Sequence, residues 1–182
     1  MIEGFNRKAI YTSDLVLFQI HGGESIDYPF YKENILPILI DLTISTLRST
    51  HTQFWRSHTS LEEAVIPIYG AINVFVMNEN GRAKKKELVS EFEFDPERQD
   101  ISAVYGDSNG NITLRLADRQ TGKHKKLRIL YKNGFLIKPL EKYTIQNYSD
   151  KGKNAVFLTI RKANPNDFKD DPELFDRDKR SY

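Results

Sequence analysis

One short segment of the chain concentrates residue types that could bind a metal ion, act as a general base or anchor an interface. It reads His51-Thr-Gln-Phe-Trp55-Arg56-Ser-His58, with two of the four histidines and the only tryptophan. On a strand the two histidines point to opposite faces, because their positions differ by an odd number. On a helix they lie about 10 Å apart, too far to share a metal ion without a third ligand. The segment therefore predicts packing or an interface with Trp55 and Arg56 as anchors. A hydrolase or nuclease that uses His51 or His58 is the alternative.

The remaining motifs do not predict catalysis. Asp107-x-Asn109-x-Asn111 resembles the start of a calcium loop, but Ile112 stands where such a loop needs glycine. A hairpin turn explains the same residues. The sequence has no phosphate-binding loop, dinucleotide-binding glycine motif, nucleophile elbow or zinc-protease helix motif. It also has no cysteine, which excludes thiol nucleophiles and cysteine-ligated metals. We therefore predict no catalytic residue, no cofactor and no metal, and we favour a protein that is not an enzyme.

Basic residues gather after two predicted turns. One cluster contains Arg82, Lys84, Lys85 and Lys86, and the other contains Lys123, Lys125 and Lys126. The net charge of +2 hides this distribution. Residues 1–100 carry 10 basic and 15 acidic side chains, residues 101–162 carry 13 and 4, and residues 163–182 carry 4 and 6. A basic region between two acidic ones indicates an acidic partner, nucleic acid or a second copy of the chain.

These charges and the lack of a catalytic motif favour a non-catalytic structural or assembly subunit of a larger complex, for example a component of a virion, phage tail or secretion machine. We expect it to contact itself or other subunits through the basic hairpin tips and an acidic C-terminal arm, anchored by Phe168 and Phe175. A nucleic-acid-binding module that uses the same Lys and Arg clusters is the alternative. We expect no membrane partner, and the sequence indicates no small-molecule substrate.

The elements that position these residues are predicted to be mainly β. Apolar and polar residues alternate over 38–45, as in a half-buried strand. From residue 70 onward, turn signals such as Asn80-Gly81 and Thr121-Gly122 separate short β-prone runs, one of them at 87–94. Such spacing predicts an antiparallel sandwich or an open barrel of hairpins. One or two short helices are expected, at the capping-box pattern Ser60-x-x-Glu63 and around 30–36. An α+β fold is the alternative.

Two regions are predicted along the chain. Residues 5–162 form the β-rich globular domain, and residues 163–182 form an extended acidic arm with few apolar anchors. The N-terminus lacks the apolar core of a secretory signal, and the longest apolar run, at 64–77, is too short to span a bilayer. We therefore expect a soluble protein that is cytoplasmic where it is made, and incorporation into a particle is an option that this expectation leaves open.

Overall fold

The predicted mainly β, antiparallel fold is confirmed. The computed structural model describes residues 16–20, 23–28, 39–57, 61–78, 80–107, 109–149 and 152–163. The strands are β1 (Val16–Ile20), β2 (Gly23–Tyr28), β3 (Leu39–Leu47), β4 (Leu61–Tyr69), β5 (Ala71–Met77), β6 (Ala83–Val89), β7 (Gln99–Gly106), β8 (Ile112–Asp118), β9 (His124–Ile129), β10 (Phe135–Ile137), β11 (Lys142–Asn147) and β12 (Ala155–Ala163). A single 3-10 turn, η3 (Tyr131–Asn133), is the helical element of the described residues.

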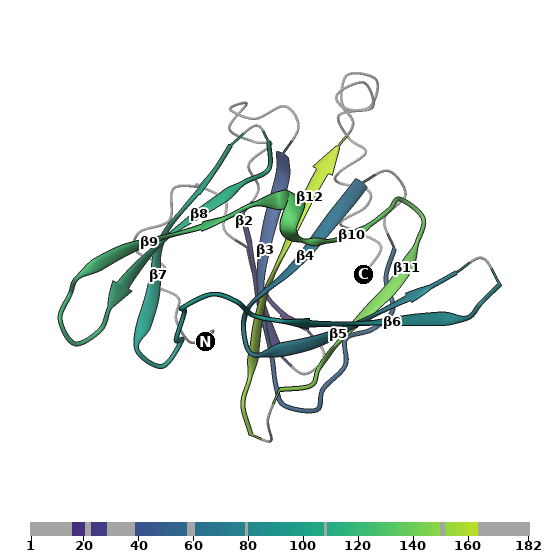
Figure 1. Ribbon diagram of the computed structural model, residues 1–182, viewed down its shortest axis with the longest axis horizontal. Helices are drawn as coiled ribbons and strands as arrows, with labels where there is room; N and C mark the ends of the chain where they lie inside the picture. Colours follow the sequence, from purple (N-terminus) through teal and green to yellow (C-terminus); the bar gives the residue numbers. More distant parts are fainter. Residues whose placement is uncertain are drawn as a thin grey trace.

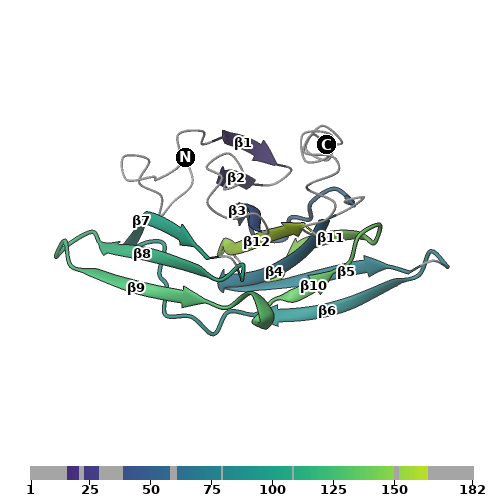
Figure 2. The same cartoon turned by 90° about the horizontal axis from the view of Figure 1, so that it is seen from above.

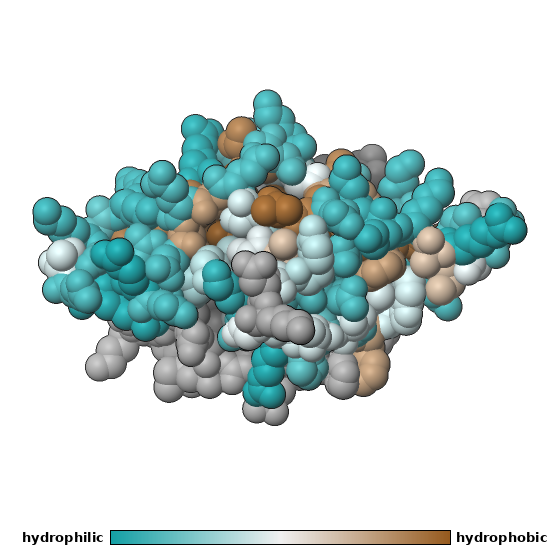
Figure 3. Space-filling model, turned by 60° about the horizontal axis from the view of Figure 1, so that its bottom comes forward, coloured by the Kyte–Doolittle hydropathy of each residue, from teal (hydrophilic) through white to brown (hydrophobic). Residues whose placement is uncertain are grey.

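Three antiparallel sheets build an open sandwich. The central sheet has six strands in the order β1-β2-β3-β12-β4-β10. The sheet β7-β8-β9 lies on one side of it, and the sheet β11-β5-β6 lies on the other (Figures 1 and 2). In Figure 3 hydrophilic residues cover the two ends of the long axis, and hydrophobic residues gather toward the middle. The sheet β7-β8-β9 and the β5–β6 hairpin are therefore the two polar ends of the molecule.

The alternation of side chains along the central strands gives each outer sheet a core of its own. On β12, Leu158 and Ile160 belong to the apolar cluster that includes residues of β7, β8 and β9. Val156 belongs to the same cluster. The residue that follows it, Phe157, belongs instead to the cluster that includes residues of β5 and β11. Because successive residues of a strand face opposite sides, one strand of alternating large apolar residues holds both outer sheets in place.

The predicted helix at the capping-box pattern is wrong, because residues 61–69 form strand β4. β4 lies between β12 and β10, and its run Ala-Val-Ile-Pro-Ile suits a buried strand. The register of β12 against β4 shifts next to Pro67, which is where a sheet tolerates a residue without an N–H. The strand predicted at 38–45 is confirmed as β3, whereas the one predicted at 87–94 ends at Val89.

Several other predictions concern residues outside those described. They are the helix around 30–36 and the C-terminal arm with Phe168 and Phe175. The structure contains no helix long and apolar enough to cross a membrane within the residues that it describes.

Candidate anion-binding surface

A β-bulge in β7 decides which side chains face solvent on the sheet β7-β8-β9. Ile101 pairs with Leu116, but Ala103 pairs with Arg115, so Ser102 is an extra residue in the ladder. The Ser102 hydroxyl donates a hydrogen bond of 3.0 Å to the Arg115 carbonyl and holds the bulge. A bulge shifts by one residue which face each later side chain occupies.

The bulge places Tyr105 on the outer face. Regular alternation from the buried Ile101 would direct Ala103 and Tyr105 inward. Instead Val104 is buried opposite Leu114, and Tyr105 lies opposite Thr113 with 37% of its surface exposed. Sequence reasoning missed this tyrosine because a period of two gives no sign of an extra residue. Its only signal is Ser102, a small polar residue within an apolar run.

The outer face around Tyr105 is basic. Arg115 of β8 lies directly opposite Lys126 of β9, Arg128 lies opposite Thr113, and His124 lies opposite Ala117. All four of these basic side chains are exposed. Like charges placed directly across a sheet destabilise it, by about 0.2–1 kcal/mol per pair. The pair of Arg115 and Lys126 therefore destabilises the sheet unless an anion binds between the two side chains.

A hollow of about 390 Å³ opens on this face, and its lining contains no carboxylate. We call it the basic hollow, and it is lined by Tyr105, Arg115, His124, Lys125 and Lys126. Arg115 and Lys126 make no ion pair with any residue that the structure describes. A concave site lined by cations and one aromatic ring has the chemistry to hold an anion.

Two carboxylates of the β7–β8 hairpin are engaged elsewhere. Asp100 forms an ion pair with Arg119, with 3.0 Å between Oδ1 and Nη2. Asp107 accepts hydrogen bonds from the backbone N–H groups of Asn109 and Asn111, so it closes the β7–β8 turn. Partial burial alone would raise its pKa, but the hydrogen bonds from Asn111 and Asn109 and the nearby Arg128 lower it below the usual value. Neither carboxylate lines the basic hollow.

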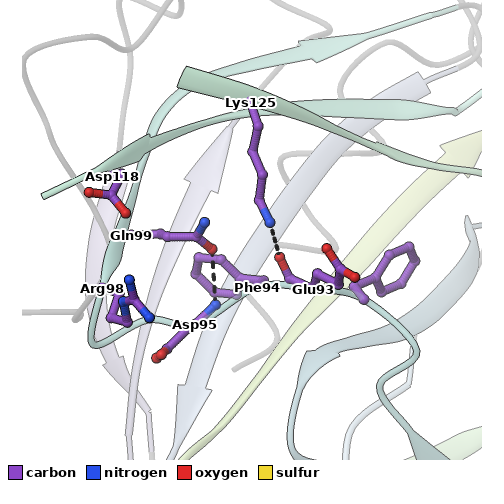
Figure 4. Close-up of a pocket in the computed structure, with 8 residues that line it drawn as sticks. Glu93, Phe94, Asp95, Arg98, Gln99, Asp118 and Lys125 are labelled. Atoms are coloured by element: carbon purple, nitrogen blue, oxygen red, sulfur yellow. Dashed lines mark hydrogen bonds between the residues drawn. The ribbon is translucent and has the colours of Figure 1, made fainter. Parts of the chain in front are cut away.

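A second hollow, of about 350 Å³, lies where the segment that follows β6 packs under the same sheet (Figure 4). Its polar groups bond to one another. Lys125 donates from Nζ to the Glu93 carbonyl at 2.5 Å, and the Asp95 N–H donates to Gln99 Oε1 at 3.1 Å. Asp118 accepts from the backbone N–H and the hydroxyl of Thr121, and these bonds hold its pKa below the usual value. This hollow is therefore better explained as a docked loop than as a ligand site.

A buried polar cluster lies on the opposite side of the central sheet. Glu63 of β4 accepts a hydrogen bond from the Tyr143 hydroxyl and lies 3.5 Å from a guanidinium nitrogen of Arg56. The same guanidinium lies 4.8 Å from the centre of the Tyr143 ring. Buried charges need such partners, so this cluster ties the segment 51–57 to β4 and β11. Arg161 is also buried there and donates to the Thr43 hydroxyl at 2.5 Å.

The structure separates the residues that the sequence singled out. The cluster Arg82–Lys86 lies on or next to β6, and the cluster Lys123–Lys126 lies on or next to β9. Figures 1 and 2 show these strands at opposite ends of the molecule, so the two basic clusters do not form one patch. Trp55 is 45% exposed, whereas Arg56 points inward. The interface role of both residues stays a prediction.

The two histidines of the segment 51–58 are not brought together as a site in the described residues. His51 Nδ1 lies 3.0 Å from the Ser49 carbonyl, within its own turn, and His58 lies outside the described residues. Across the described ranges, no three His, Cys, Asp or Glu side chains are grouped so that they could hold a metal ion.

Comparisons with known proteins give a fold and no family. No family model matches the chain, and no curated protein matches it. Among solved structures, oxalate decarboxylase from Bacillus subtilis at pH 4.6 is 14% identical with a TM-score of 0.51, and 88% of this chain and 31% of that chain are covered. The Lactobacillus farciminis oxalate decarboxylase formate complex is 12% identical with a TM-score of 0.50, covering 83% and 31%. This chain spans about a third of the length of these relatives.

These likenesses correct the predicted function. The prediction of a structural subunit of a virion, phage tail or secretion machine is wrong, because the two solved structures above, which share the fold, are oxalate decarboxylases. At such low identity they establish the jelly-roll-like β sandwich alone. The Bacillus subtilis oxalate decarboxylase contains Mn(II) centres. The described residues of this chain do not offer the donor set for such a centre, since no suitable group of His, Cys, Asp or Glu is present among them.

Proposed function

We propose that this chain binds an anionic, phosphate-bearing small molecule in the basic hollow on the outer face of β7-β8-β9. The observation that carries the proposal is the cross-strand pair of Arg115 and Lys126 in a hollow without a carboxylate. Hydrogen bonds from charged donors to phosphate oxygens are the strong class of polar contact. An anion between the two side chains would also remove the repulsion that the pair imposes on the sheet.

The volume of the hollow favours a small molecule over a long polymer. About 390 Å³ falls at the lower end of the range of small-ligand sites, which is roughly 300–1,000 Å³. This hollow is the indication of a small-molecule ligand that the sequence did not supply. Nucleic acid, expected above as a possible partner, remains a prediction and enters the tests below as a competing ligand.

The proposal is tested with inorganic pyrophosphate as the probe, by calorimetric titration of the whole chain at low ionic strength. The variant Arg115→Ala/Lys126→Ala should lower the affinity by at least about tenfold. A hydrogen bond to a charged group contributes about 1.5–3 kcal/mol, and 1.4 kcal/mol is a factor of ten. Affinity should also fall as salt rises, because the site is open to solvent.

The matched control is Lys84→Ala/Lys86→Ala, which removes the same charge from exposed positions on β6 at the other end of the molecule. This control should leave pyrophosphate binding unchanged. Equal losses in the two double variants would show that net charge alone governs binding. That result, or the absence of binding to the unmodified chain, would overturn the proposal.

A further inference from the structure

A third cation stands next to the pair that marks the basic hollow. Lys126 and Arg128 are two residues apart on β9, where they lie opposite Arg115 and Thr113. Both side chains are exposed. Successive residues of a strand face opposite sides, and each advances the chain by about 3.3 Å, so Lys126 and Arg128 leave the same face about 6.6 Å apart. One ligand can therefore contact the cross-strand pair and Arg128 together.

The charges around Arg128 limit how far such a ligand extends. Arg128 forms no ion pair with any residue that the structure describes. It is close enough to Asp107 for the two charges to interact, but that carboxylate accepts hydrogen bonds within the β7–β8 turn. An anion that runs along β9 from the pair thus meets attraction as far as Arg128 and repulsion at the turn beyond it. On the other side of the pair, the next position on this face of β9 is His124, opposite Ala117.

We propose that the ligand of the basic hollow carries a short chain of three phosphoryl groups, which runs along β9 from the Arg115–Lys126 pair to Arg128. This inference rests on the proposed function, since it names the class of phosphate-bearing molecule that the same site takes. Two phosphoryl groups lie between Arg115 and Lys126, and the third accepts hydrogen bonds from the planar guanidinium of Arg128. Inorganic triphosphate and the triphosphate of a nucleotide share this chemistry.

The experiment compares pyrophosphate, inorganic triphosphate and adenosine triphosphate as probes, by calorimetric titration of the whole chain. We expect triphosphate to bind at least about tenfold more tightly than pyrophosphate, in line with the usual contribution of one hydrogen bond to a charged group. Arg128→Ala should abolish this preference. Its affinity for pyrophosphate should change no more than that of Lys84→Ala, which removes one exposed charge from β6. Arg128→Lys keeps the charge without the planar set of donors, so it should keep part of the preference.

The outcomes separate this inference from the proposed function. Pyrophosphate binding without a preference for triphosphate overturns the three-phosphoryl ligand and leaves the anion site standing. A preference that survives in Arg128→Ala has the same effect, because it would come from the charge of the probe alone. Binding of neither probe overturns both proposals.

The remaining arms identify the source of the phosphoryl chain. Adenosine triphosphate that binds as tightly as inorganic triphosphate supports a nucleotide, and much weaker binding supports a free phosphate chain. A single-stranded hexanucleotide that binds far more tightly than triphosphate would overturn the short chain and replace it with a polymer.

Discussion

The cross-strand pair of Arg115 and Lys126 predicts that stability and binding respond in opposite directions to one substitution. Lys126 is exposed on β9, the edge strand of its sheet, directly opposite Arg115. Lys126→Glu replaces two like charges with an opposite pair at the same two positions. The protein should become more stable at low salt, and it should no longer bind pyrophosphate.

The expected magnitude follows from the geometry of the pair. Removing a like-charge cross-strand pair and creating an opposite pair each contribute roughly 0.2–1 kcal/mol. Exposure to solvent keeps the sum near the lower end, so we expect about 0.5–1 kcal/mol. For a chain of this size, each kcal/mol raises the midpoint of thermal unfolding by roughly 2–4 °C. The gain should shrink as salt approaches about 1 M, where the screening length falls to about 3 Å.

The assay is thermal unfolding followed by circular dichroism at low and high salt, paired with the pyrophosphate titration. Lys84→Glu is the control, because Lys84 faces Val76 across the sheet, so this substitution creates no charge pair directly across the strands. The reasoning is refuted if Lys126→Glu lowers the midpoint at low salt or leaves the affinity for pyrophosphate intact. An equal gain in Lys84→Glu would refute the part played by the cross-strand pair.

Two further predictions concern the joint between the β7–β8 turn and the central sheet. Gly110 has a φ of +80°, and a Cβ placed there would lie 2.8 Å from Lys162 Cδ and 3.1 Å from the Tyr131 ring. Gly110→Ala should therefore lower the free energy of unfolding. The control is Gly122→Ala, whose Cβ would meet nothing within 4 Å, and the loss at Gly110 should exceed the loss at Gly122 by about 1 kcal/mol or more. Equal losses in denaturant titrations would contradict this prediction. The Tyr131 hydroxyl donates to Glu62 at 2.8 Å, and burial first, then Glu62, raises its pKa above the ordinary value. As pH rises, the Tyr131 hydroxyl loses its proton in the unfolded chain before it does so in the folded one. The free energy of unfolding should therefore decline above about pH 10, the pKa of tyrosine in the unfolded chain, and Tyr131→Phe should reduce the decline. A pH dependence that is the same in both proteins would exclude this role for Tyr131.

The sequence predicted the local elements well where the signal itself is local. Gly81 and Gly122 have the positive φ expected of their hairpin tips, and β3 shows the alternation read at 38–45. The capping-box pattern at Ser60 failed for a non-local reason. A pattern of Ser and Glu three positions apart describes the start of a helix, but β4 is stabilised by pairing with β12, whose residues lie about ninety positions away in the chain.

The sequence predicted only some of the residues of the candidate site. Lys125 and Lys126 were chosen for their charge, and both line the basic hollow. Arg115 went unnoticed, because its role depends on the β8–β9 register that sets it opposite Lys126. Tyr105 also went unnoticed, because its place on the outer face depends on one extra residue in β7.

The most direct test of the account is pyrophosphate titration at low ionic strength of the unmodified chain, Arg115→Ala/Lys126→Ala and Lys84→Ala/Lys86→Ala. The account predicts binding to the unmodified chain, an unchanged affinity in the β6 variant, and a loss of at least about tenfold in the β8–β9 variant. No binding, or equal losses in the two variants, would contradict it.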